Sequence, residues 1–163
     1  MSGANDRGSE DQRDEEAKER HHRELVELLN ELRVALPGVQ VLFAFLLTVP
    51  FTSRFDSLTS AQTNVFLGAF LATGIASLLL IAPSAYHRIR FRDGDEERMM
   101  RTANRWALAG LSFLAIALVL VVYLVAELVA STAFAIIAAV TFAALALSLW
   151  FALPMSRRRD SGP

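Results

Sequence analysis

Four long apolar stretches constrain the fold of this chain more than any other feature. They cover residues 36–55, 63–86, 106–126 and 132–153. Each comes close to, or exceeds, the roughly 20 residues that an α-helix needs to cross about 30 Å of hydrocarbon. A soluble bundle is the alternative, but a stretch such as LSFLAIALVLVVYLVA has no polar face to present to water. The sequence therefore predicts an all-α fold, an integral membrane four-helix bundle over residues 36–154.

Charged residues are separated from these stretches. Although 20% of the 163 residues are charged, only Arg54, Asp56 and Glu127 lie in the apolar stretches or in the short turns between them. Cations precede the first stretch, fill the loop between the second and third, and follow the fourth. Because Lys and Arg concentrate on the cytoplasmic side, we expect both termini in the cytoplasm and a multi-pass protein of the cytoplasmic (inner) membrane. The polar N-terminal region does not resemble a cleaved signal peptide, so we expect the first stretch to be an uncleaved anchor.

Residues 14–35 have a different pattern, which predicts a cytoplasmic amphipathic helix. Leucines recur at helical spacing among acidic residues, at Leu25, Leu28, Leu29, Leu32 and Leu36. This helix either binds other protein, including copies of itself, or is a solvated extension of the first span. Residues 1–13 are polar and expected to be disordered, and residues 155–163 form a basic cytoplasmic tail.

Gln40 is an unusual residue for a membrane span. Together with Ala44, Thr48 and Thr52 it forms a stripe at intervals of four residues. Such a stripe predicts that this side of the first span faces a partner helix or a cavity.

The second stretch offers a surface for close packing. Gly68, Ala72 and Ala76 form a row of small residues that lets helix backbones approach closely. By contrast, we expect the third stretch, with Val and Leu around its middle, to meet lipid over much of its surface. The polar residues of the first two spans are the candidates for a pathway or for helix contacts: Gln40, Thr48, Thr52, Asn64 and Thr73.

Charged residues at the ends of the spans are candidates for a pathway entrance or for lipid headgroup binding: Glu127, His87, Arg88 and Arg90. The alternatives are a polar turn residue for Glu127 and inner-leaflet anchors for the others. No cysteine is present, and the adjacent His21 and His22 diverge on a helix, so the sequence predicts no metal site and no cofactor. Nothing resembles a catalytic constellation, and we expect no enzymatic activity.

Three segments together resemble a known family. ELRVALPGVQVLFAFLLTVPF, RFDSLTSAQ and LLLIAPSAYHRIRFRDGDEERMMRTANR are similar to small actinobacterial membrane proteins of unknown function, the family DUF6328, over about residues 31–110. The resemblance implies a four-span membrane fold and brings no established site residues. Members are sometimes labelled sodium/proton antiporters. Proton exchange commonly uses a titrating group deep in the membrane, however, and no Asp, Glu, Lys, Arg or His lies near the middle of any stretch.

Two functions remain open from the sequence. The first is a small oligomeric ion channel or transporter whose pathway is lined by spans one and two. The second is a non-conducting membrane scaffold or regulatory module that acts through its cytoplasmic helix. Since four spans barely enclose a route, conduction would require assembly. We therefore expect a homo-oligomer in the lipid bilayer, with anionic lipid at the inner leaflet and no nucleic-acid partner.

Overall fold

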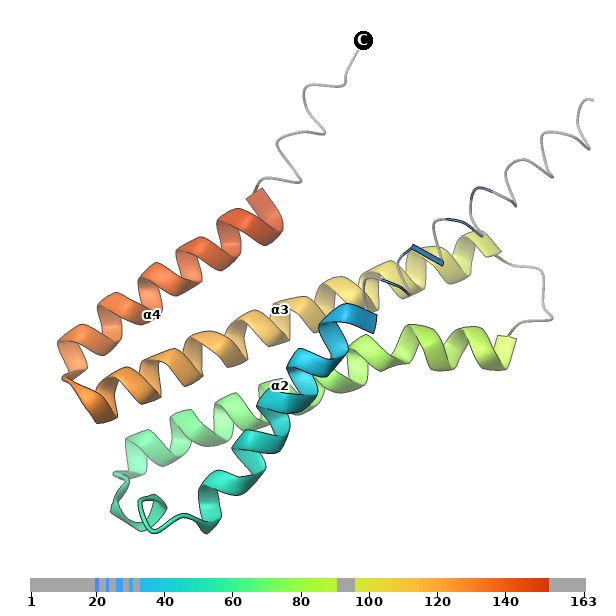
Figure 1. Cartoon of the computed structure of the whole chain (residues 1–163). Helices are drawn as coiled ribbons and strands as arrows, with labels where there is room; N and C mark the ends of the chain where they lie inside the picture. Colours follow the sequence, from blue (N-terminus) through green and yellow to red (C-terminus); the bar gives the residue numbers. More distant parts are fainter. Residues whose placement is uncertain are drawn as a thin grey trace, which may run out of the picture.

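Within the described residues, four helices are long and apolar enough to cross a membrane, at Arg33–Phe51, Ser60–Ala85, Arg101–Val129 and Thr132–Trp150. The computed structural model describes residues 33–90 and 96–152, with side chains for 33–85 and 101–150, and also describes Arg20, Arg23, Val26, Glu27 and Asn30. This part of the chain is helical apart from its turns (Figure 1). The predicted all-α class and the predicted four apolar helices are confirmed.

The first span is an α-helix over residues 33–48. Short 3-10 helices, three further α-helices and a π-helical end follow, with the bounds η1 (Val49–Phe51), η2 (Phe55–Ser57), α2 (Ser60–Arg90), α3 (Glu96–Val129), α4 (Thr132–Leu147) and η3 (Ser148–Ala152). The five described residues before Arg33 are helical and exposed. Leu25, Leu28, Leu29 and Leu32, which were predicted to form the apolar face of the amphipathic helix, lie outside the described residues, as do residues 1–13 and 155–163.

The α2–α3 hairpin is longer than the predicted spans. α2 continues to Arg90, and α3 begins at Glu96 instead of at residue 106. With 34 residues, α3 is about 51 Å long at about 1.5 Å per residue, whereas the hydrocarbon core of a bilayer is about 30 Å thick. The two helices therefore extend beyond the apolar region, through charged residues that the sequence pattern assigned to a loop.

Side-chain caps fix where α2 and α4 begin. The Thr59 backbone N–H donates to Gln62 Oε1 at 3.0 Å, and the Gln62 N–H donates to Thr59 Oγ1 at 3.3 Å. These reciprocal bonds form a capping box, which satisfies N–H groups that have no partner within the helix. At α4, Ser131 Oγ accepts from the Phe134 N–H at 3.3 Å. Both caps lie at the same end of the bundle, in the turns that follow the first span and α3.

Small side chains bring α2 and α3 into close contact. Buried residues recur along α2 at intervals of three and four, a spacing typical of helices that cross at a shallow angle; they are Phe66, Ala69, Thr73, Ala76 and Leu80. On α3, Ala107 shares a cluster with Ala76 and Leu80, and Gly110 lies against Leu80. Ala103 and Ala117 of α3 are also buried. This hairpin forms the centre of the fold.

The predicted row of small residues in the second span is used within the chain. A Cβ atom added to Gly68 would come within 3.3 Å of Leu120 of α3, and Ala72 and Ala76 are buried. The row therefore allows close approach, as expected, but Gly68 faces α3. It is Gly74, outside the row, that faces the first span, where its nearest neighbour is the Phe43 ring.

The first span packs across the hairpin and shares two apolar clusters with it (Figure 1). In one cluster Val39 of the first span joins Ala76, Leu80 and Ala107. In the other, towards η1, Leu46 joins Phe66 and Leu124. Each cluster therefore contains residues of the first span, α2 and α3.

Of α2 and α3, α4 packs against α3. Its buried residues are the small side chains Ala135, Ala139 and Ala146, and its opposite face, with Ile137 and Val140, is exposed. The third span thus has helices on two sides, and its contact with lipid over the remaining surface stays a prediction. α3 lies between α2 and α4 and shares both clusters with the first span, so α4 presents the larger apolar surface to its surroundings.

Candidate functional site

The polar side chains inside α2 and α3 bond to their own helices. Thr73 is fully buried, and its hydroxyl donates to the Ala69 carbonyl oxygen at 2.7 Å. The Ser77 hydroxyl donates to the Thr73 carbonyl at 3.0 Å, and Ser112 donates to Leu108 at 2.8 Å. Among the described residues, no buried side-chain nitrogen or oxygen lacks a partner. The hydrogen-bond donors of these hydroxyl groups are therefore satisfied within their own helices.

The stripe of the first span lies on the outside of the chain. Gln40, Ala44, Thr48 and Thr52 are all exposed. The hydroxyls of Thr48 and Thr52 each donate, at 2.7 Å, to a carbonyl three residues earlier, that of Phe45 and Val49 respectively. The Gln40 amide makes no hydrogen bond with the described part of the chain. None of the described helices covers this stripe.

The five candidate pathway residues do not gather in one enclosed place. Asn64 is exposed on the second turn of α2, and Thr73 is buried against its neighbours on the same helix. Gln40, Thr48 and Thr52 point away from the packed side of the first span. A route lined by all five residues is thus not formed within the single chain.

Phenylalanine rings fill the contact between the first span and α2. Phe43 stacks on Phe70 with ring centroids 5.2 Å apart, Phe70 lies 6.4 Å from Phe66, and Phe55 meets the Phe66 ring edge-on at 5.3 Å. Aromatic pairs in such geometries attract each other beyond the effect of burial alone. The sequence analysis missed this cluster of rings, although Phe66 and Phe70, four residues apart on one helix face, were a signal for it.

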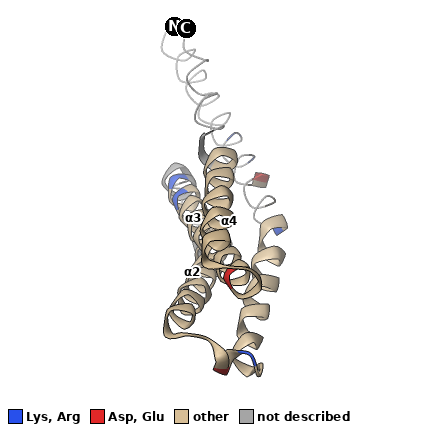
Figure 2. Cartoon of the chain, turned by 90° about the vertical axis from the view of Figure 1, so that its left-hand side faces the viewer, with Lys and Arg blue, Asp and Glu red and all other residues tan. Residues whose placement is uncertain are grey.

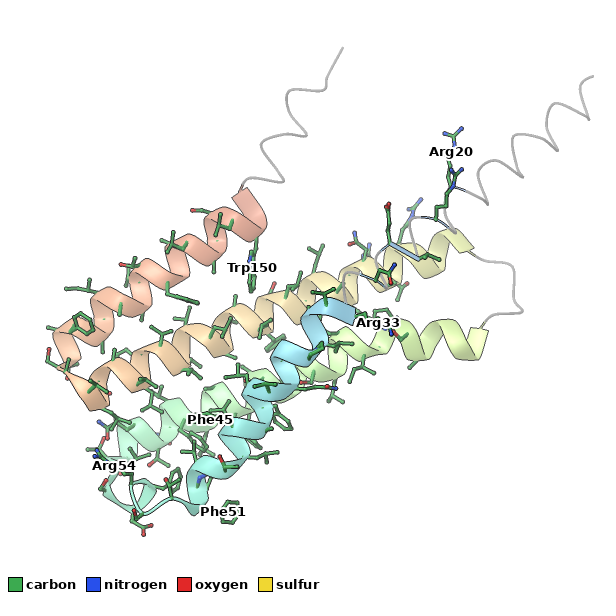
Figure 3. The ribbon with its side chains drawn as sticks, viewed as in Figure 1. Arg20, Arg33, Phe45, Phe51, Arg54 and Trp150 are labelled. Carbon is green, nitrogen blue, oxygen red and sulfur yellow. The ribbon has the colours of Figure 1, made fainter. Side chains whose placement is uncertain are left out.

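Charged residues of the described chain lie at or near the ends of the helices and in the turns (Figure 2). Arg33 lies at one end of the first span, and Phe51 and Arg54 lie at the other (Figure 3). Near the α3–α4 turn, the Thr132 hydroxyl donates to Glu127 Oε1 at 3.4 Å. This contact joins the last turn of α3 to the first residue of α4. Glu127 therefore has the position of a polar residue at a turn between two helices.

The arginine-rich end of α2 is described only in part. The helix backbone includes His87, Arg88 and Arg90, but their side chains lie outside the described residues. Arg101 and Arg105 near the start of α3 are exposed. In the described part of the chain, no group of three or more His, Cys, Asp or Glu side chains is arranged to hold a metal ion.

Comparison with known proteins places the chain in a family. The model of a Family of unknown function (DUF6328) matches residues 14–154, which is most of the chain and includes all four apolar helices. No curated protein and no solved structure matches the sequence. The chain belongs to the family of unknown function DUF6328.

Proposed function

We propose that this protein is a non-conducting scaffold or regulatory module of the cytoplasmic membrane, which acts through its N-terminal cytoplasmic segment. The observation that supports this most is that polar side chains within the spans form hydrogen bonds with their own helices. The hydroxyls of Thr48, Thr73, Ser77 and Ser112 are all bonded to carbonyls of their own helices. The ring cluster and the small-residue contacts fill the space between helices, where a pathway through one chain would have to run.

The proposed orientation has both termini in the cytoplasm. It rests on the arginines before the first span, between α2 and α3, and after the fourth span, in contrast to the single Arg54 in the opposite turns. In this orientation, the ends of α2 (to Arg90) and α3 (from Glu96) that extend beyond the apolar region would lie in the cytoplasm, as would the N-terminal segment. A partner protein would meet both segments together.

The test combines a flux assay with a search for partners in cells. Purified protein in liposomes should leave the leakage of H⁺, Na⁺ and K⁺ equal to that of protein-free vesicles. A biotinylating enzyme fused to the N-terminus should label a defined set of neighbours, and deleting residues 14–33 should remove that set without preventing membrane insertion. Flux that increases with the amount of protein, or a labelled set that the deletion does not change, would contradict the proposal.

A conducting route is the second candidate, and the exposure of Gln40, Thr48, Thr52 and Asn64 favours it. In the single chain these residues face outwards, so such a route would have to lie between chains of an oligomer. Its signature would be a flux that Gln40→Leu alters while the protein stays assembled. Glu127, His87, Arg88 and Arg90 would then be its candidate entrances, and anionic lipid at the inner leaflet would bind the three cations.

A further inference from the structure

We propose that two copies of this chain associate through the outer face of the first span, held by reciprocal hydrogen bonds between their Gln40 amides. The outer face consists of exposed residues on the side opposite the two apolar clusters: Pro37, Gln40, Val41, Ala44, Phe45 and Thr48. The inference concerns assembly, so it applies to a non-conducting module and to a channel alike.

Gln40 lies inside the apolar first span, seven residues after Arg33, so in a bilayer its backbone would be about 10 Å from that end of the helix. It is three residues, about 5 Å along the helix axis, from Phe43. The Phe43 ring in turn lies 3.5 Å from the Cβ position of Gly74, in the middle of the Ser60–Ala85 span. Since hydrocarbon provides neither hydrogen-bond donors nor acceptors, an amide at this depth is costly unless another protein group pairs with it.

The described part of the chain does not supply this partner. Gln40 forms no hydrogen bond with the described residues, and the nearby Thr48 hydroxyl already donates to the Phe45 carbonyl. Lipid tails cannot bond to an amide, and ester groups of the headgroups lie at the surface of the bilayer. The exposed face of α4 differs in this respect, because Ile137 and Val140 are satisfied by lipid alone.

A second copy of the chain matches the chemistry of this face. A glutamine amide both donates and accepts hydrogen bonds, so two copies related by a two-fold axis can satisfy each other. Val41, Ala44 and Thr48 follow at intervals of three and four residues, the spacing by which two helices interlock. The small Ala44 and Thr48 side chains permit close approach. The small-residue row of α2 is already covered within the chain, so it is not available for close packing with a second copy.

Cysteine cross-linking tests the location of the interface, because the chain has no cysteine of its own. Val41 and Leu78 are matched positions on different helices, with 71% and 72% of their side chains exposed. In membranes, Val41→Cys should form a covalent dimer on oxidation, whereas Leu78→Cys should remain monomeric. A dimer formed equally by both variants, or by Leu78→Cys alone, would overturn the proposed interface.

Fluorescence energy transfer between labelled copies in liposomes tests the role of the amide. A membrane hydrogen bond of ordinary strength predicts that Gln40→Leu weakens association by about 3- to 30-fold, seen as a shift of the association midpoint to higher protein-to-lipid ratios. Gln40→Asn keeps the amide group and should associate more strongly than Gln40→Leu. Because Gln40 is exposed, neither change should alter the helix content of the monomer. Equal association of the wild type and Gln40→Leu would overturn the amide pairing, whatever the flux assay shows.

Discussion

Gly110 of α3 lies directly against Leu80 of α2: a Cβ atom added to Gly110 would come within 2.8 Å of Leu80 Cγ and 2.9 Å of Leu80 Cδ2. Carbon atoms in favourable contact are about 3.5–4.0 Å apart. Leu80 is fully buried in a cluster with Val39, Ala76 and Ala107, so it has little room to move aside. The α2–α3 contact therefore depends on the absence of a side chain at residue 110.

A larger side chain at this contact should destabilise the bundle. We expect Gly110→Val to lower the free energy of unfolding by about 2–3 kcal/mol, because it overpacks a filled core. Reversible unfolding in mixed micelles measures the change. The matched control is Gly38→Val, since a Cβ at Gly38 would have no atom within 4 Å, and there we expect a change below about 0.5 kcal/mol. Equal effects at both glycines would show that the Leu80 contact does not limit residue 110.

The ring cluster should hold the first span on α2. Phe70 stacks with both Phe43 and Phe66, so we expect Phe70→Leu to lower the unfolding free energy by about 1–3 kcal/mol, at about 0.5–1.5 kcal/mol for each ring pair. Phe51, which is 90% exposed, is the control for losing a phenyl ring as such. If Phe51→Leu were as destabilising as Phe70→Leu, the ring contacts would not be the cause.

The capping box at the start of α2 predicts a coupled pair of mutations. Thr59→Ala should lower the unfolding free energy by about 1 kcal/mol, because it removes the acceptor for the Gln62 N–H. Gln62→Ala removes the reciprocal bond to the Thr59 N–H. Since the two bonds support one helix end, the double variant should lose less than the sum of the single losses. Strict additivity in a double-mutant cycle would show that the two bonds act independently.

The proposed orientation predicts which sites a membrane-impermeant thiol reagent can reach. In intact cells, single cysteines at Ser2, Gly94 and Ser161 should be protected, and a cysteine at Ser57 should react. The physical reason is the placement of the arginines, which stay on the cytoplasmic side during insertion. Permeabilised cells, in which all four sites should react, are the control. Reaction of the Gly94 variant from outside would contradict both the four-span arrangement and the cytoplasmic hairpin.

The sequence predicted the number of helices but not their neighbours. Apolar length alone identifies a span, and the structure has four such helices. Around Val119, Leu120, Val121 and Val122, however, α3 is apolar on every side, so no periodicity shows which side faces protein. The contact of α3 with α2 uses the small residues Ala107 and Gly110, three residues apart, a spacing that the apolar length of the span does not reveal.

The residues of the candidate site were predictable from the sequence, but the side of the helix that faces the rest of the chain was not. Gln40 is recognisable as the amide within an apolar span, and the stripe it forms with Thr48 follows from helical spacing. Whether such a stripe faces the inside of the same chain depends on which side of the helix buries more apolar area. Val39 and Leu46 on the opposite side of the first span belong to the two clusters, and their burial turns Gln40 outwards.

α4 contributes no described residue to either cluster, and of α2 and α3 it contacts α3. The apolar contacts that join the first span, α2 and α3 therefore do not depend on it. A substitution in the alanine-lined contact between α4 and α3 would loosen one helix and leave both clusters in place.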